Sequence, residues 1–175
     1  MDYYGTVGND NIVGSVNNDY IDGWTGDDSL YGEAGNDSIL GYDGNDYIDG
    51  WTGDDSLYGE AGNDYMLGYD GYDYLSGGDG NDVLNGEAGN DYLVGGYGAD
   101  TFVFNSLSDG VDTIADFYWE EGDTIEVSQF GFGATSTNEF FYDNYNGDLF
   151  FQGNLFATIE NVPTDFSTEL DIALV

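Results

Sequence analysis

Hydrophobic residues recur at every ninth position between Gly5 and Val103, in eleven consecutive units that align without insertion or deletion. Each unit opens with the six-residue pattern Gly-x-x-Gly-x-Asp, which is rich in residues that favour turns. Three residues follow, and only the middle one is always apolar, which predicts a short strand with one buried face. The apolar residues at this eighth place are Ile12, Ile21, Leu30, Ile39, Ile48, Leu57, Met66, Leu75, Leu84, Leu93 and Phe102.

One unit cannot bury an aliphatic side chain alone, so the units are expected to stack. Two units would form one coil of about 18 residues, with successive coils paired in parallel about 4.8 Å apart. The eleven units then predict a solenoid of about five and a half coils, about 26 Å long. Its core is a thin layer of one apolar residue per unit, which is not expected to offset the conformational entropy of the chain without further stabilisation.

The charge of the chain indicates that a cation supplies this stabilisation. The sequence has 36 Asp and Glu residues and no Lys, Arg or His, which gives a formal net charge of -36. Carboxylate and carbonyl oxygens favour Ca²⁺, whose flexible coordination suits glycine-rich turns better than the octahedron of Mg²⁺. Zinc is disfavoured because the chain has neither Cys nor His. The sixth place of the unit is always acidic, and its residues are Asp10, Asp19, Asp28, Asp37, Asp46, Asp55, Asp64, Asp73, Asp82, Asp91 and Asp100.

Glycine occupies the first place of all eleven units and the fourth place of ten. Asn17 is the exception at the fourth place, and we expect it to fit because Asn adopts left-handed backbone conformations more easily than most residues. The second place holds bulky residues such as Trp24 and Glu33, where a positive φ would be strained.

This pattern resembles the nonapeptide repeat of the RTX (hemolysin-type) calcium-binding family, G-G-x-G-x-D-x-U-x. The resemblance covers 99 of 175 residues, although the second place is Gly only at Gly78 and Gly96. It implies an all-β fold, a right-handed parallel β-roll, in which calcium lies between the turns of units two apart. One turn supplies its Asp and the carbonyls of places two and four, and the other supplies its Asp and the carbonyls of places one and three. Eleven units contain nine such pairs, so up to nine calcium ions are expected.

The resemblance also implies which backbone carbonyls bind the ions. The site of Asp28 and Asp46 would use the carbonyls of Trp24, Gly26, Gly41 and Asp43. Candidate carbonyls elsewhere along the roll are those of Glu33, Gly35, Tyr42, Gly44, Gly50, Trp51, Thr52, Gly53, Gly59, Ala61, Gly62, Gly68, Asp70, Gly77, Asp79, Gly86, Ala88, Gly95 and Tyr97. The alternative, that the Asp residues only cap turns, is disfavoured because stacked carboxylates without a cation would repel each other.

The chain is expected to contain two regions, the roll at residues 5–103 and a non-repetitive, aromatic-rich cap at residues 104–175. A cap is expected because solenoids need their open ends covered. Asn146-Gly147 predicts a hairpin between residues 140 and 151, and Gly153-Asn154 predicts a second turn, so the cap should be a small antiparallel meander. Residues 1–4 are expected to be a short stub that leaves the first coil uncapped.

Two further carboxylates precede this meander. Asp112 and Asp116 could hold another ion, although a surface position is the favoured interpretation. A longer repeat of 27 residues, in which the segment from Trp24 recurs at Trp51, corresponds to one and a half coils. Trp24 and Trp51 are therefore expected on opposite edges, which indicates duplication more than a single binding face.

The composition excludes several functions. Without Lys, Arg or His there is no basic surface for nucleic acid or for anionic membranes, and no apolar run reaches the ~20 residues of a membrane span. Catalysis that needs His or Lys is excluded. Paired carboxylates could in principle hydrolyse a glycoside, but the roll carboxylates are expected to be used by calcium and no acid pair stands out in residues 104–175, so no enzymatic activity is expected.

The C-terminal sequence Leu170-Asp-Ile-Ala-Leu-Val175 is similar to the uncleaved type I secretion signal of RTX proteins. The favoured hypothesis is therefore a secreted, extracellular or cell-surface module that folds on binding calcium and is exported by a type I secretion apparatus. One alternative is a structural protein that self-assembles in calcium through its uncapped N-terminal coil, as a filament, surface layer or matrix. Another is a polysaccharide-binding module that uses its exposed Trp and Tyr side chains.

Overall fold

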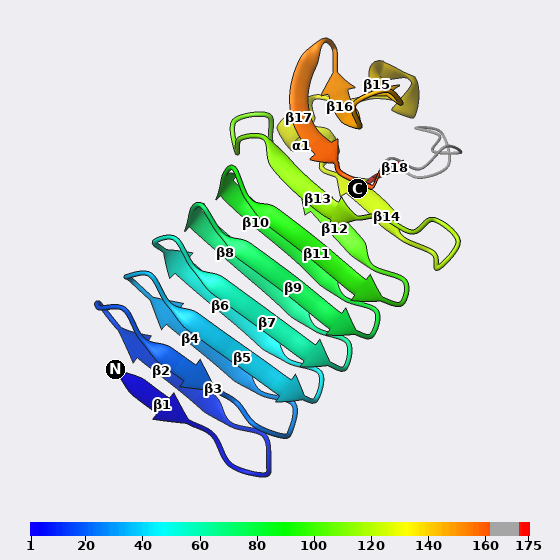
Figure 1. The fold of residues 1–175 in the computed structure, drawn as a ribbon. Coiled ribbons are helices and arrows are strands. Elements are labelled where there is room, and N and C mark those ends of the chain that lie inside the picture. The colour runs from blue at the N-terminus through cyan, green and yellow to red at the C-terminus, as the bar shows by residue number, and fades with distance from the viewer. Residues whose placement is uncertain (162–171) are drawn as a thin grey trace.

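The computed structural model describes residues 1–161 and 172–175, and it confirms the expected parallel β-roll. From β1 to β14, successive strands alternate between two facing sheets, so that each strand from β3 onwards pairs in parallel with the strand two before it (Figure 1). One sheet has ten strands in the order β1-β3-β5-β7-β9-β11-β13-β17-β16-β15, and the other has eight in the order β18-β14-β12-β10-β8-β6-β4-β2.

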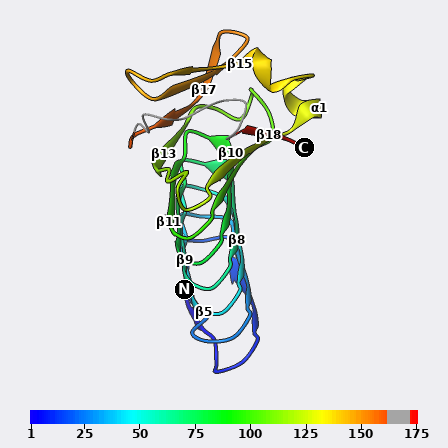
Figure 2. The same cartoon turned by 90° about the vertical axis from the view of Figure 1, so that its right-hand side faces the viewer.

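The strands of the repeat region are short and evenly spaced. Their bounds are β1 (Asp2–Tyr4), β2 (Asn11–Ser15), β3 (Tyr20–Asp22), β4 (Ser29–Glu33), β5 (Ser38–Asp43), β6 (Tyr47–Thr52), β7 (Ser56–Ala61), β8 (Tyr65–Gly71), β9 (Tyr74–Asp79), β10 (Val83–Gly89), β11 (Tyr92–Tyr97) and β12 (Thr101–Phe104). The register joins equivalent places 18 residues apart, as in Ile39 opposite Leu57. The expected coil of two units is therefore confirmed, and its stacked turns are visible along the roll axis in Figure 2.

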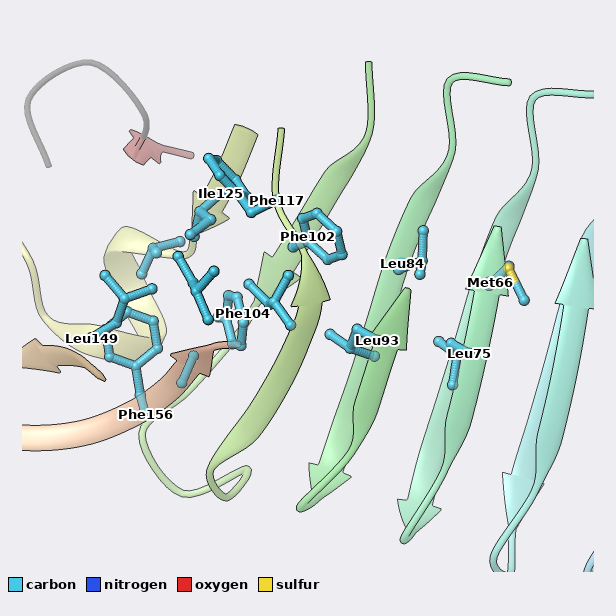
Figure 3. Packing of buried hydrophobic residues seen from close by; sticks show 14 of the residues in the cluster. Met66, Leu75, Leu84, Leu93, Phe102, Phe104, Phe117, Ile125, Leu149 and Phe156 are labelled. Atoms are coloured by element: carbon cyan, nitrogen blue, oxygen red, sulfur yellow. The ribbon is translucent and has the colours of Figure 1, made fainter. Parts of the chain in front are cut away.

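The eighth-place side chains form the core between the two sheets. All of them from Ile21 to Phe102 are fully buried, whereas Ile12 in the first coil is only partly buried. Figure 3 shows how Met66, Leu75, Leu84 and Leu93 project in sequence into this narrow interior. The expected layer of one apolar residue per unit is thus confirmed.

Parallel stacking continues beyond the repeats. The elements of this region are β13 (Asp112–Asp116), β14 (Thr124–Val127), α1 (Gln129–Phe132), η1 (Thr137–Glu139), β15 (Phe140–Asp143), β16 (Asp148–Phe151), β17 (Asn154–Ile159) and β18 (Ile172–Leu174). Strands β13 and β14 pair in parallel with β11 and β12, and β17 and β18 then pair in parallel with β13 and β14. The expected antiparallel meander is limited to β15, β16 and β17, which cover the end of the roll (Figure 1).

Two details of the N-terminal coils differ from the sequence-based expectations. Residues 2–4 are more than a stub, because β1 pairs in parallel with β3 and extends the ten-stranded sheet by one strand. The expectation of a left-handed conformation at Asn17 is wrong, because Asn17 is not among the residues with positive φ. Gly8, at the fourth place of the preceding unit, lacks a positive φ as well.

Candidate metal centre

The sixth-place carboxylates form two ladders, one along each edge of the roll. In each ladder, the Oδ1 atom accepts a hydrogen bond from the backbone N–H of the sixth-place Asp two units earlier. The N–H of Asp46, for example, donates to Oδ1 of Asp64 at 2.8 Å, and the same bond recurs from Asp10 to Asp100 at 2.7–2.9 Å. These bonds fix each carboxylate inside its turn, and Asp19 to Asp100 are buried.

The second carboxylate oxygen has no such partner. In nine of these residues the Oδ2 atom is buried and accepts no hydrogen bond from the described residues. They are Asp28, Asp37, Asp46, Asp55, Asp64, Asp73, Asp82, Asp91 and Asp100. A buried carboxylate oxygen without a partner is costly, and nine in one small fold require a common explanation.

Backbone carbonyls lie close to these unpaired oxygens. A β-carbon built on Gly23 would lie 2.6 Å from Oδ2 of Asp28 and 3.0 Å from the carbonyl oxygen of Gly41, which is the first-place residue two units later. A side chain at Gly23 would therefore fill the space between a carboxylate and a carbonyl oxygen that the sequence assigned to one calcium site. The first-place glycines keep this space open.

The fourth-place glycines have a different role. Gly26, Gly35 and Gly53 have φ values of 126°, 121° and 131°, a region that other residues rarely adopt. A β-carbon at Gly35 would also lie 2.6 Å from the backbone of Asn17 in the preceding coil. The glycine pattern thus reflects both the turn conformation and the close approach of successive turns.

The second place adopts positive φ even where it is not glycine. The φ values of Trp24, Glu33, Tyr42, Trp51, Glu60 and Tyr69 lie between 73° and 76°, and that of Glu87 is 64°. The strain expected at this place is therefore present. In the first two units, Thr6 and Ser15 instead donate their backbone N–H groups to Oδ2 of Asp10 and Asp19, at 2.6 Å in both cases. In the turns where the second place has a positive φ, Oδ2 of the sixth-place Asp is therefore unpaired. In the first two turns, where the second place lacks a positive φ, Oδ2 accepts a hydrogen bond.

Burial raises the pKa of the carboxylates in the middle of the roll, and the neighbouring carboxylates add to the increase. The backbone N–H donors offset only part of this effect. The pKa reaches about 6 for Asp46, Asp82 and Asp91, and about 7 for Asp55, Asp64, Asp73 and Asp100. Without a cation, the compact roll therefore holds these groups in an environment that disfavours their charge at neutral pH.

The ladders extend past the repeats, which sequence reasoning missed. Asp112 and Asp123 are buried, and their Oδ1 atoms accept hydrogen bonds from the N–H groups of Asp91 and Asp100 at 3.0 and 2.9 Å. The preferred surface interpretation of Asp112 is therefore wrong, and burial raises its pKa to about 8. Asp116 is half-buried and accepts hydrogen bonds from the N–H groups of Gly95 and Gly96.

A second ladder on the outer side of the turns was also missed. The fifth-place side chain accepts a hydrogen bond from the N–H of the fifth-place residue two units later, as in Asn45 to Asp27 at 2.9 Å and Asn63 to Asn45 at 2.9 Å. The preference for Asn and Asp at this place was the signal available in the sequence. These exposed side chains connect successive turns directly and leave the inner carboxylates for another partner.

The carboxylates alone do not complete a metal site. Within residues 1–161 and 172–175, no three acidic side chains converge on one position that would suit a metal ion. The donor set available in each turn is therefore carboxylate oxygen together with backbone carbonyl oxygen, which is the set that Ca²⁺ prefers.

Within residues 1–161 and 172–175, no helix combines the length and apolar character needed to cross a bilayer.

Comparison with solved structures finds a number of similar chains, among them the following two. Extracellular lipase LipA from Serratia marcescens aligns over 100% of this chain with 19% identity and a TM-score of 0.40, and this chain spans 40% of the lipase. The AlgE6R3 subunit of the Azotobacter vinelandii mannuronan C5-epimerase aligns over 97% of this chain and 80% of its own length, with 22% identity and a TM-score of 0.33. A search of curated proteins found no match.

Comparison with protein families identifies one family whose profile matches most of the chain. The sequence profile of the RTX calcium-binding nonapeptide repeat, which contains four copies of the repeat, matches residues 4–39, 25–57, 40–75, 67–102 and 76–111. These overlapping matches cover more than half of the chain and include every sixth-place Asp of the repeats. The chain therefore belongs to the RTX calcium-binding repeat family, and its cofactor is calcium.

Proposed function

We propose that this chain is a calcium-dependent folding module of a secreted protein. The observation that supports the proposal most strongly is the set of nine buried Oδ2 atoms without a hydrogen-bond partner. They lie in a chain with a net charge of -36 and no basic side chain, so a bound cation would supply the missing interaction at neutral pH.

Each site would take ligands from two stacked turns. For the pair formed by Asp28 and Asp46, the carbonyls of Trp24 and Gly26 would come from the first turn, and the carbonyls of Gly41 and Asp43 from the second. The hydrogen bond from the N–H of Asp28 to Oδ1 of Asp46, 2.8 Å long, joins the two turns of this site in the folded roll. Nine pairs of units two apart give nine sites, which equals the number of unpaired Oδ2 atoms.

The roll would then fold only when these sites are occupied. Its core is one apolar side chain per unit, and its carboxylates repel one another when they are ionised. Such a chain has too little apolar burial and too much charge to fold by itself at neutral pH. A low-calcium cytosol would keep it extended for export, and calcium outside the cell would allow it to fold.

Export by a type I secretion apparatus is the second part of the proposal. It is supported by the acidic repeat and by the C-terminal sequence from Leu170 to Val175, of which Leu170 and Asp171 lie outside the described residues. A chain without residues 170–175 should be exported poorly from cells that carry such an apparatus. Efficient export of that chain would refute the signal assignment. The proposal assigns calcium binding, and no catalytic step, to this chain.

The folding proposal is tested by size-exclusion chromatography with light scattering and far-ultraviolet circular dichroism, first in chelator and then in millimolar calcium at pH 7.5. An expanded monomer should become compact and gain strand signal. A compact, strand-rich protein in chelator would refute the proposal.

The same experiment tests self-association. Strands β1 and β2 are edge strands of the two sheets of this chain, and an exposed edge can pair with another chain. A structural protein would grow into large particles in calcium as its concentration is raised, whereas a module would keep the mass of a monomer.

A further inference from the structure

Two equivalent clefts lie on opposite edges of the roll, outside the carboxylate ladders. The first has a volume of about 340 Å³ and is lined by Asp22, Trp24, Thr25, Tyr42 and Asp43. The second has a volume of about 180 Å³ and is lined by Trp51, Thr52, Tyr69 and Asp70. Each lining residue of the second cleft lies 27 residues after its counterpart in the first, so the longer repeat has produced the same cleft twice.

The walls of both clefts are exposed aromatic side chains. Trp24 and Trp51 are 54% and 48% exposed, although aromatic side chains of this size are usually more buried. In the second cleft, the rings of Trp51 and Tyr69 have centroids 6.2 Å apart and planes tilted by 40°. Two tilted rings at this distance form a concave surface that suits a rounded group, whereas a sugar ring stacks best on one flat face.

The clefts also carry carboxylates with unused hydrogen-bonding capacity. Asp22 lines the first cleft, and its counterpart Asp49 lies beside Trp51 and Tyr69 of the second. Asp49 is only 4% exposed, and the Oδ1 atoms of both residues are buried without a hydrogen-bond partner among the described residues. Neither residue belongs to the sixth-place ladders, so the proposed calcium sites do not account for them.

More acidic groups surround the aromatic walls. Glu60 pairs in register with Tyr42 next to the first cleft, and Glu87 pairs with Tyr69 next to the second. Asp43 and Asp70 line the clefts themselves. The chain has no basic side chain that could approach these groups.

We propose that each cleft binds an organic cation, specifically a quaternary ammonium group. The faces of Trp and Tyr attract such a cation, and nearby carboxylates add an electrostatic attraction. A small metal ion would gain little from the aromatic walls, because it prefers oxygen ligands. A neutral ligand would leave the negative charge of the cleft uncompensated. The two clefts predict two binding sites per chain.

The third copy of the longer repeat is a natural control. The positions equivalent to Asp22, Trp24 and Tyr42 carry Ser76, Gly78 and Gly96 there, so the carboxylate and both aromatic walls are missing while the roll continues. Glycine is also the residue best suited to this place, where Trp24 and Trp51 have φ values of 75° and 74°. A Trp-to-Gly change therefore removes the aromatic wall and relieves strain at once.

Isothermal titration of the calcium-saturated chain with choline chloride, at constant ionic strength, tests the proposal. We expect saturable binding with a stoichiometry of two, and binding of the neutral analogue 3,3-dimethylbutan-1-ol that is weaker by about fivefold or more. Trp24→Gly or Trp51→Gly should each reduce the stoichiometry to one, and the double variant should abolish binding. The double variant Asp22→Asn and Asp49→Asn should bind about fivefold more weakly.

Tyr72→Asn is the matched control, because it removes a 66% exposed aromatic side chain outside the clefts at a place where other units carry Asn. It should bind choline as the parent does, and circular dichroism in calcium should be the same for all variants. Sedimentation with phosphatidylcholine vesicles distinguishes two sources of the quaternary ammonium group. If the ligand is a lipid headgroup, the parent chain should sediment with the vesicles and the double Trp variant should not. If the ligand is a free solute, both chains should stay in solution. Absence of saturable choline binding, equally tight binding of the neutral analogue, or undiminished binding by the double Trp variant would overturn the proposal.

Discussion

The roll and the C-terminal end of the molecule are stabilised by different interactions. Along the roll, each unit contributes one fully buried apolar side chain, and the space at the turns is occupied by carboxylates. At the C-terminal end, Phe132, Phe140, Phe151 and Phe156 pack around one another with ring centroids 4.9–6.1 Å apart. Figure 3 shows the transition from single aliphatic residues to a three-dimensional cluster around Phe104 and Phe156.

This difference separates two ways in which a small β structure can be stable. The aromatic cluster is held together by apolar burial, so we expect its stability to depend less on ions. The roll places buried charge where a larger domain would place apolar side chains, so its stability depends on the cation that binds there.

Removal of calcium should have the largest effect, and it should affect the roll first. In chelator at pH 7.5, backbone amides of β4 to β10 should lose protection from hydrogen exchange, because their ladders bring ionised carboxylates together without a cation. Amides of β16 and β17 should retain more protection, since aromatic packing holds them. Equal loss of protection in both regions would show that the aromatic cluster has no stability of its own.

Acid should partly replace calcium. The pKa of Asp64 and Asp73 in the compact roll is about 7, above the ~3.9 expected in an unfolded chain. The compact calcium-free state is therefore favoured at about pH 4 and loses stability as the pH rises from about 4 to about 7. Circular dichroism in chelator should show more strand at pH 5 than at pH 8. In calcium the direction reverses, because binding requires ionised carboxylates, and a calcium-free roll that gains structure as the pH rises would contradict the assignment.

Loss of one ladder carboxylate should have a smaller effect. Asp64→Asn keeps the Oδ1 acceptor for the N–H of Asp46 but removes the charge of a buried group. We expect a loss of about 1–3 kcal/mol of calcium-linked stability, measured as a several-fold higher calcium midpoint. Asp79→Asn is the matched control, because Asp79 is an exposed third-place side chain outside the ladder. A similar shift of the calcium midpoint in both variants would mean that the effect comes only from the change in net charge.

Relief of backbone strain should have the smallest effect, in the stabilising direction. Glu60 has a φ of 75°, and Glu60→Gly should stabilise the calcium-bound roll by about 1 kcal/mol or less, after the entropy of glycine is taken into account. Glu60→Gln keeps the strain and removes the charge, so thermal unfolding of the two variants separates the two contributions. Destabilisation by Glu60→Gly would mean that the Glu60 side chain makes a stabilising contact.

The sequence was sufficient to predict the roll because its nine-residue period carries the fold information redundantly. The place of each core residue from Ile21 to Phe102 follows from that period, and so does the alignment of the ladder carboxylates. The hairpin at Asn146-Gly147 was also predictable, because its turn signal is local.

The parts that were missed lie where the period is interrupted. Asp112 and Asp123 join the ladders at spacings of 21 and 23 residues instead of 18, because loops are inserted before them. Parallel pairing of β18 with β14 joins residues far apart in sequence and has no local signal. The conformation of Asn17 differs because the first two turns satisfy their Oδ2 atoms with the N–H of the second place, which does not require a left-handed turn.

The most direct test of the central claim is a calcium titration at pH 7.5 in which bound ions are counted by equilibrium dialysis while folding is followed by circular dichroism. The claim is that nine buried, unpaired carboxylate oxygens mark nine ions whose binding stabilises the roll. It predicts about nine ions per chain, bound over the same calcium range in which strand structure forms. A chain that is already folded before calcium is added, or that folds fully with only one or two ions bound, would contradict it.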